Sequence, residues 1–188
     1  MKITGIILAG GLSSRMGKDK GIIQLDKDKM IEKIIHLLTP FCDDFLISAN
    51  NNNYSSFGIN VVNDKTKRIG PLGGIYSCME ENDSNLYVVM SCDTPNITDI
   101  TIAKLFDNIE DFDVVVPERN ERLEPLISLF SSNAVPKIKI EVEKENFKLQ
   151  NVIRKLNYTI LKIENNKETE KEFLNINTNE DLKKYYEN

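Results

Sequence analysis

The chain has 188 residues, and its 24 Lys and Arg against 29 Asp and Glu give a formal net charge of −5. Hydrophobic residues make up 40% of the chain and charged residues 28%, a balance typical of a globular protein with a substantial buried core. The mild acidity argues against nucleic acid or an anionic membrane as the main partner, and the length suits one domain.

Cysteine and histidine contents exclude several kinds of site. The three cysteines, Cys42, Cys78 and Cys92, are widely spaced and form no C-x-x-C pair, which argues against a disulfide framework or a structural zinc site. We expect them to be mostly buried residues of a cytoplasmic protein. The only histidine, His36, leaves no basis for a multi-histidine metal site and nearly excludes a Ser-His-Asp triad. We expect it on the surface of a helix.

The first predicted element is a strand over residues 3–9, which is apolar and rich in Ile. Because the run is short and ends at glycines, it fits neither a signal peptide nor a membrane span. Similar runs that are nearly continuous rather than alternating follow at 45–49, 60–63, 86–91 and 112–117. Such runs are typical of strands buried on both faces of a parallel sheet.

Segments with helical spacing lie between these strands. They cover 30–38, 75–79 and 99–109, and Thr98 is the expected cap of the third. Alternating strands and helices predict βαβ units and right-handed crossovers. The predicted fold is therefore α/β, a three-layer αβα sandwich with a Rossmann-like, mostly parallel sheet.

The remaining third of the chain is less regular, and no linker separates it from the rest. We therefore expect a single domain over residues 1–188. The elements expected here are a strand at 126–130 with antiparallel pairing as one option, a helical region at 134–156 with a break near Asn146, a strand at 158–163, a polar loop at 165–171, and a final helix capped by Thr178.

The turn after the first strand is rich in groups that bind anions. Gly10 and Gly11 let the backbone turn sharply and expose N–H groups, and Ser13 adds a hydroxyl donor. Arg15 and Lys20 stand in the same short stretch, which nevertheless matches neither a Walker A loop nor G-x-G-x-x-G. Such a density of cations directly after a first strand favours a phosphate site over a solvated glycine turn.

Two further positions allow both a functional and a structural interpretation. Asp93 follows the most apolar strand and precedes Thr94-Pro95, so it could hold Mg²⁺ or simply form the turn. The stretch 70–74 reads Gly-Pro-Leu-Gly-Gly. It could be a loop that approaches a base or phosphate, or it could only mark the entry to a helix.

The motif L-A-G-G-x-x-x-R-M-G-x-x-K at residues 8–20 resembles the signature of the molybdenum cofactor guanylyltransferase family. Further matches follow in the same order along nearly the whole chain. They are residues 70–75, 91–95, 124–126 and 173–178. Together, the five matches in register are a specific signal.

The resemblance implies transfer of GMP from GTP to the molybdenum–molybdopterin cofactor, with release of pyrophosphate and with Mg²⁺ as the cofactor. It also implies a nucleotide-binding part over about residues 1–118 and an acceptor- or partner-binding part over about residues 119–188. Partner proteins would be those of molybdopterin synthesis or the molybdoenzymes supplied.

Specific residues carry over from the family by position. The catalytic candidates are Arg15, Lys20 and Asp93, and the metal candidates are Asp93 and Asn177. Asn177 is expected to share one face of a strand with Asn175. The nucleotide-binding candidates are Leu8, Ala9, Gly10, Gly11, Ser13, Arg15, Lys20, Ser48, Asn50, Asp64, Gly70, Pro71, Leu72, Gly73 and Asp93. Ser48 replaces a family Asn, which makes Asn50 the stronger candidate of that pair.

Three alternatives remain open at this stage. Two are sister enzymes, a cytidylyltransferase for the same cofactor and a sugar-1-phosphate nucleotidyltransferase. The third is a nucleotide-binding delivery partner of molybdoenzymes without catalysis. Retention of Arg15, Lys20 and Asp93 together argues against the third, because a mere binder has less need of all of them.

Overall fold

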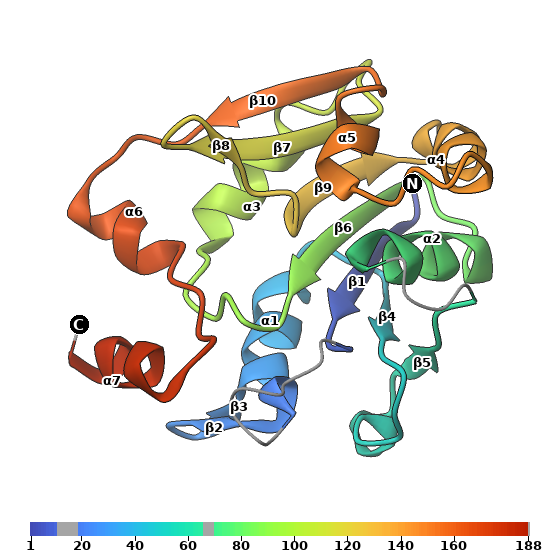
Figure 1. Cartoon of the computed structure of the whole chain (residues 1–188). Helices are drawn as coiled ribbons and strands as arrows, with labels where there is room; N and C mark the ends of the chain where they lie inside the picture. The colour runs from blue at the N-terminus through green and yellow to red at the C-terminus, as the bar shows by residue number, and fades with distance from the viewer. Residues whose placement is uncertain (11–18, 66–69, 188) are drawn as a thin grey trace.

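The computed structural model describes residues 1–10, 19–65 and 70–187. Within these ranges the main sheet has the strand order β10-β7-β9-β6-β1-β4-β5, with β8 paired to β7 (Figure 1). A small hairpin, β2 with β3, forms a second sheet. The strands are β1 (Ile3–Leu8), β2 (Gln24–Leu25), β3 (Asp28–Lys29), β4 (Asp44–Ser48), β5 (Asn60–Val62), β6 (Leu86–Ser91), β7 (Val114–Arg119), β8 (Arg122–Leu123), β9 (Ile127–Ser131) and β10 (Tyr158–Lys162).

The sheet is mostly parallel, as predicted. β1 pairs in parallel with β4 and β6, β4 with β5, and β7 with β10, whereas β9 runs antiparallel to both β6 and β7. In the register, Leu8 at the end of β1 stands opposite Ser48 of β4 and Ser91 of β6. The chain first adds β4 and β5 on one side of β1 and then returns to place β6 on the other. The strand order therefore reverses between β1 and β6, where open α/β sheets bind ligands beyond the carboxyl ends.

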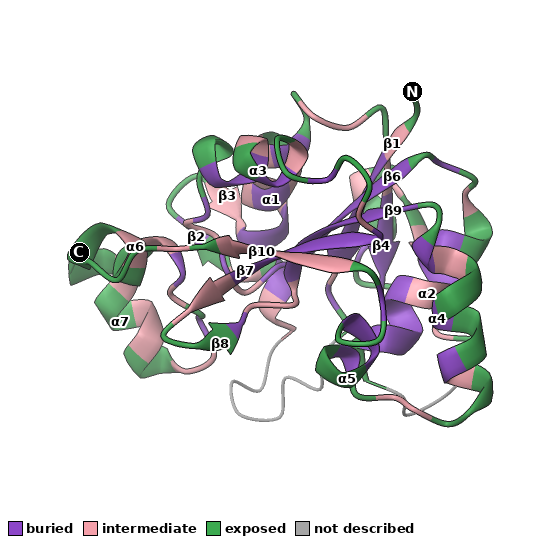
Figure 2. Ribbon diagram, turned by 90° about the horizontal axis from the view of Figure 1, so that it is seen from above, coloured by how far each residue is buried: buried purple, intermediate pink, exposed green. Residues whose placement is uncertain are grey.

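Helices cover both faces of the sheet (Figure 2). One face packs against α1 and α3, and the other against α2, α4 and α5. The helices are α1 (Met30–Leu38), α2 (Pro71–Glu81), α3 (Asp99–Phe106), α4 (Ala134–Glu143), α5 (Leu149–Ile153), α6 (Lys167–Glu172) and α7 (Asn179–Glu187). The predicted three-layer sandwich is confirmed.

Adjacent residues of one strand belong to different halves of the core. Ile7 of β1 packs in the cluster that contains Ile34 of α1, whereas Ile6 packs in the cluster that contains Ile75 of α2. Both Ile side chains are fully buried. Since successive side chains of a strand point to opposite faces, burial on both faces explains why the strands read as continuous apolar runs.

The C-terminal segment folds back onto the connection between β1 and α1. Ile176 forms a small buried cluster with Leu25 of the hairpin and Met30 of α1, and Leu182 and Tyr185 of α7 pack against it. α7 and the hairpin lie at the same end of the molecule (Figure 1). This packing places the residues around position 177 beside the hairpin and the start of α1.

Two local predictions in this region were wrong. The segment 165–171, predicted as a polar loop, contains α6, whose N-cap Asn166 accepts a hydrogen bond from the Thr169 N–H. The strand expected to carry Asn175 and Asn177 does not form, since the described residues around them pair with no strand. Asn175 is exposed there and Asn177 is half-buried, so their expected common strand face does not exist.

The second helix also begins earlier than the spacing predicted. α2 starts at Pro71, with Gly70 in the left-handed region at φ 65° as its cap residue. Residues 71–74 are thus the first helical turn rather than a loop. By contrast, Thr98 caps α3 as predicted, because its hydroxyl oxygen accepts from the Thr101 N–H.

Burial agrees with the expectations for cysteine and histidine. Cys78 and Cys92 are buried, Cys42 is half-buried, and all three thiols are free. His36 is exposed on α1. Among the helices formed by the described residues, none has the length and apolar character needed to cross a membrane.

Candidate functional site

The loops after the central strands are held together by backbone hydrogen bonds at one edge of the sheet. The Ala9 N–H donates to the Ser48 carbonyl at 2.9 Å, and the Cys92 N–H donates to the Leu8 carbonyl at 3.1 Å. The ladder thus continues past the strand ends, and Gly10 and Asp93 follow directly. We refer to this side of the molecule as the carboxyl edge.

Three of the predicted site residues meet at the carboxyl edge. Lys20 opens the short 3-10 helix η1 (Lys20–Ile22), Asp93 follows β6, and Asn177 precedes α7. The Lys20 ammonium donates a hydrogen bond to Asn177 Oδ1 and lies 3.7 Å from Asp93 Oδ2. The Ile176 N–H donates to the Asp93 carbonyl at 2.8 Å. A cation, a carboxylate and an amide from distant parts of the chain therefore form one cluster.

Asp93 has an oxygen with no partner among the described residues. Its Oδ1 is buried and accepts no hydrogen bond there, a state that is costly unless something satisfies the atom. The described part of the chain also holds no group of three or more His, Cys, Asp or Glu arranged for a metal. A divalent cation at Asp93 would depend on amide, water and phosphate oxygens, the ligands that Mg²⁺ commonly takes.

A second polar pair lies on the β4–β5 side of the carboxyl edge. Asn50 Nδ2 donates to Asp64 Oδ2 at 2.9 Å, and the Asp64 N–H donates back to Asn50 Oδ1 at 2.9 Å. Asn50 is exposed and Asp64 is half-buried, so both remain within reach of a ligand. Ser48 is different, since it is only 5% exposed and its hydroxyl lies beneath Gly74 of α2.

The remaining predicted nucleotide-binding residues differ in accessibility. Gly70 and Pro71 are exposed at the start of α2, whereas Leu72 and Gly73 are buried. Ala9 is buried, Leu8 is half-buried and Gly10 is exposed. A Cβ on Gly10 would lie 3.2 Å from Ala49 Cα, so glycine allows a close approach to the β4 loop. Gly11, Ser13 and Arg15 lie outside the described residues.

Tyr54 is a buried polar residue at this edge that no sequence motif pointed to. The Tyr54 ring is fully buried, and its hydroxyl hydrogen-bonds to the Asp19 carboxylate. Burial, reinforced by the bond to Asp19, raises the pKa of Tyr54 far above its usual value, which keeps the phenol neutral. No local sequence pattern predicts this contact, because the two residues are far apart in the sequence.

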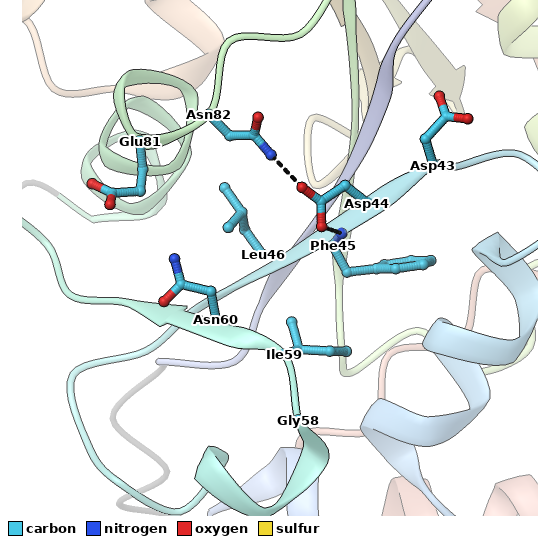
Figure 3. Close-up of a pocket in the computed structure, with 9 residues that line it drawn as sticks. All are labelled: Asp43, Asp44, Phe45, Leu46, Gly58, Ile59, Asn60, Glu81 and Asn82. Carbon is cyan, nitrogen blue, oxygen red and sulfur yellow. Dashed lines mark hydrogen bonds between the residues drawn. The ribbon is translucent and has the colours of Figure 1, made fainter.

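A cavity of about 400 Å³ lies at the opposite edge of the sheet (Figure 3). Asp44, which lines it, begins β4, whereas Asp93 follows the end of β6. The Asp44 carboxylate already accepts from Asn82 Nδ2 at 2.7 Å and from the Phe45 N–H at 2.8 Å. Unlike Asp93, this carboxylate is satisfied by the protein, so we do not include the cavity in the candidate site.

Comparison with known proteins assigns the family. Residues 5–159 match the model of the MobA-like NTP transferase domain. The chain belongs to this family. The match begins within β1 and ends at the start of β10, so it includes both the stretch from Gly10 to Asp93 and the antiparallel β9.

Curated relatives within the MobA-like family align over nearly the whole chain. The molybdenum cofactor guanylyltransferase of Vibrio parahaemolyticus is 31% identical, over 96% of this chain and 93% of its own length. That of Shewanella halifaxensis is 30% identical, over 95% of this chain and 91% of its own length. These relatives confirm the resemblance that the five sequence motifs indicated.

A solved structure supports the same fold. The molybdopterin-guanine dinucleotide biosynthesis protein A of Archaeoglobus fulgidus superposes with a TM-score of 0.79 at 22% identity, covering 98% of this chain and 97% of the other. The MobA-like chain therefore shares the architecture of that protein over almost its full length.

Proposed function

We propose that this MobA-like protein transfers GMP from GTP to the molybdenum–molybdopterin cofactor, releasing pyrophosphate and forming molybdopterin guanine dinucleotide. The observation that carries the proposal is the convergence of Lys20, Asp93 and Asn177 where the strand order reverses. The names of relatives about 30% identical over most of the chain supply the substrates. The three free thiols suit a reducing compartment, and we assign the reaction to the cytoplasm.

In this proposal GTP occupies the β1–β4–β5 side of the carboxyl edge. The exposed backbone at Gly10 and Gly70 approaches phosphate or base, and the Asn50–Asp64 pair contacts the nucleoside. Because Ser48 and Leu72 are buried, any contact from these two goes through their backbone. Gly11, Ser13 and Arg15 remain predictions from the motif.

We further propose that Asp93 and Asn177 hold Mg²⁺. The buried Asp93 Oδ1 without a protein partner supports this role, as does the amide oxygen of Asn177 that Lys20 contacts. A bound Mg²⁺ would neutralise charge on the phosphate oxygens. The Lys20 ammonium, next to both side chains, is suited to stabilise the negative charge that develops on the departing pyrophosphate.

In the proposed reaction the protein mainly positions the two substrates and stabilises charge. A phosphate oxygen of the acceptor attacks the α-phosphorus of GTP in line, the bond to the bridging oxygen of the β-phosphate breaks, and pyrophosphate leaves. Since the acceptor phosphate is already anionic at neutral pH, no general base is required. This agrees with a chain whose single histidine, His36, lies exposed on α1.

We assign the acceptor to the other side of β6, within residues 119–188. The carboxyl end of β7 and the start of β9 reach the same edge there, because β7 is parallel to β6 through the antiparallel β9. The Arg119 guanidinium lies 5.6 Å from the centre of the Phe173 ring, and Arg119 Nε lies 4.0 Å from Glu124 Oε1. Arg119 and Glu124, which both keep some side-chain exposure, offer polar contacts for a phosphorylated pterin or for a partner protein that delivers it, and the buried Phe173 ring supports Arg119 from below.

Pyrophosphate release tests the proposal. The full chain is incubated with Mg²⁺, molybdopterin and GTP, CTP or UTP in parallel. We expect release with GTP only, and only when the acceptor is present. Preference for CTP would assign the sister cytidylyltransferase activity. Tight GTP binding without any release would favour a delivery partner instead.

A further inference from the structure

The Tyr54 hydroxyl links two positions that flank residues 11–18. It lies 3.1 Å from the carbonyl oxygen of Ala9, directly after β1, and it hydrogen-bonds to Oδ1 of Asp19. The Tyr54 side chain itself is fully buried in the core. A single rigid ring therefore joins Ala9 and Asp19.

Asp19 gathers further donors around the same point. Its Oδ2 accepts from Asn51 Nδ2 at 2.9 Å and from Asn53 Nδ2 at 3.2 Å, both in the loop after β4. Its Oδ1 accepts from the Gly21 N–H at 3.3 Å, so that Asp19 also caps η1. The residue next to Asp19 in the chain is Lys20. The backbone of Lys20 is thus held by a carboxylate that is itself held from several sides.

The Tyr54 hydroxyl is closely packed against the backbone of Gly21. A Cβ on Gly21 would lie 2.5 Å from the Tyr54 oxygen, which is closer than non-bonded atoms approach. Cys92, which is buried and adjacent to Asp93, belongs to the same core cluster as Tyr54 and Ala9. Tyr54 therefore links the residue after β1 to the one before Lys20, within the core cluster that also holds the residue before Asp93.

We propose that Tyr54 and Asp19 form a clasp that positions Lys20 for nucleotidyl transfer. This inference rests on the proposed function of the site. A lysine side chain has several rotatable bonds, so the location of its ammonium depends on how firmly the backbone beneath it is held. The clasp supplies that support without touching substrate, and both residues are positioning residues rather than catalytic ones.

The test combines Tyr54→Phe with a matched control, Tyr87→Phe. Tyr87 is also buried, but it lies near the start of β6, and within the described ranges its hydroxyl bonds to backbone groups, donating to the Asn82 carbonyl at 2.8 Å. Both variants lose one buried hydroxyl and keep the ring. We expect similar losses of thermal stability, but only Tyr54→Phe should lower kcat for pyrophosphate release, by about tenfold or more.

A double variant separates positioning from general weakening of the fold. If the clasp acts through Lys20, the activity of Lys20→Ala/Tyr54→Phe should equal that of Lys20→Ala alone. By contrast, the small effect of Tyr87→Phe on turnover should be the same in the Lys20→Ala background as in the wild type. If Tyr54→Phe does not fold, Asp19→Asn, which keeps the shape of the side chain, can replace it in the same comparison with Lys20→Ala.

Two results would overturn the clasp while leaving the proposed function intact. One is wild-type turnover in Tyr54→Phe or Asp19→Asn. The other is a loss in the double variant equal to the product of the two single losses. Absence of GTP-dependent turnover in the wild-type chain would instead refute the proposed function itself, so the two failures are distinguishable.

Discussion

Only one of the two carboxylate oxygens of Asp93 has a partner among the described residues. Oδ2 lies 3.7 Å from the Lys20 ammonium, whereas the buried Oδ1 has no hydrogen-bond partner among the described residues. Buried acceptors in folded proteins are nearly always satisfied, so this atom, which lies beside a lysine and an amide, supports the ligand role that we propose for Asp93. The turn interpretation of Asp93 alone does not account for this atom.

Replacing Asp93 by Asn should remove metal-dependent turnover without unfolding the protein. Loss of the carboxylate charge weakens cation binding, and we expect a fall in kcat of at least about a hundredfold. Mn²⁺ binding, measured by electron paramagnetic resonance in the presence of GTP, should weaken in parallel. Asp43→Asn, at the opposite edge, is the control and should keep both properties. Unchanged Mg²⁺ dependence in Asp93→Asn would remove Asp93 from the metal site.

Lys20→Ala should lower turnover while leaving the fold intact. Its ammonium is directed at Asn177 and Asp93, and removing a preorganised cation from a developing charge costs on the order of a hundredfold in kcat. Circular dichroism and thermal unfolding should change little. Lys144→Ala, which removes an exposed cation near Glu141 on α4, serves as the control. Wild-type rates in Lys20→Ala would contradict the role assigned to it.

At the scale of elements, α2 approaches the sheet unusually closely at Gly74. A Cβ there would lie 2.1 Å from Ser48 Oγ and 3.2 Å from Asp64 Oδ1. We expect Gly74→Ala to destabilise the protein by about 1–3 kcal/mol through overpacking and to weaken GTP binding by displacing Asp64. Adding Ser48→Gly removes the atoms in conflict and should restore much of both. Urea unfolding and calorimetric titration measure the two effects. No rescue by Ser48→Gly would show that the strain lies elsewhere.

The junction of α4 and α5 depends on one carboxylate. Glu141 accepts from Lys155 Nζ at 2.5 Å and from Asn146 Nδ2 at 2.7 Å. The Lys155 bond, with help from Asn146, lowers the pKa of Glu141 to about 2. A carboxyl group with a lowered pKa stabilises the fold above its unfolded pKa of about 4.5, and this contribution is lost as pH falls toward 2.

Stability measured against pH should therefore reveal Glu141. The difference in unfolding free energy between wild type and Glu141→Gln should be largest near neutral pH. It should shrink between about pH 4.5 and pH 2, as the wild-type carboxyl group takes up a proton. Urea unfolding across that range provides the measurement. A difference that stays constant with pH would mean that the charge of Glu141 does not stabilise the junction.

For the whole molecule, the sequence predicted the layers well because burial on both faces leaves a strong pattern. The run Leu86–Ser91 was predicted with its observed limits, since every residue of β6 is buried. α1 was likewise predicted over Met30–Leu38, because its buried residues recur with helical spacing. Membership of the MobA-like family, indicated by motifs along the chain, is confirmed by the family model.

The elements that sequence analysis missed lack such a pattern. α6 buries none of its residues, so no apolar periodicity marks it, and its polar composition resembles a loop. The clasp of Tyr54 and Asp19 also leaves no sequence pattern, because its hydrogen bond joins residues 35 positions apart. The proximity of Lys20 to Asn177, 157 positions apart, followed from the family motifs and not from any local physical signal.

The central claim is that Lys20, Asp93 and Asn177 form one site for a nucleotide and its metal. The most direct test is a crystal structure of the full chain soaked with GTP and Mg²⁺. We expect metal density on Asp93 and Asn177, the triphosphate against the Lys20 ammonium, and the guanosine beside Asn50 and Asp64. Nucleotide and metal bound away from the carboxyl edge, with Asp93 Oδ1 free of any ligand, would contradict the account.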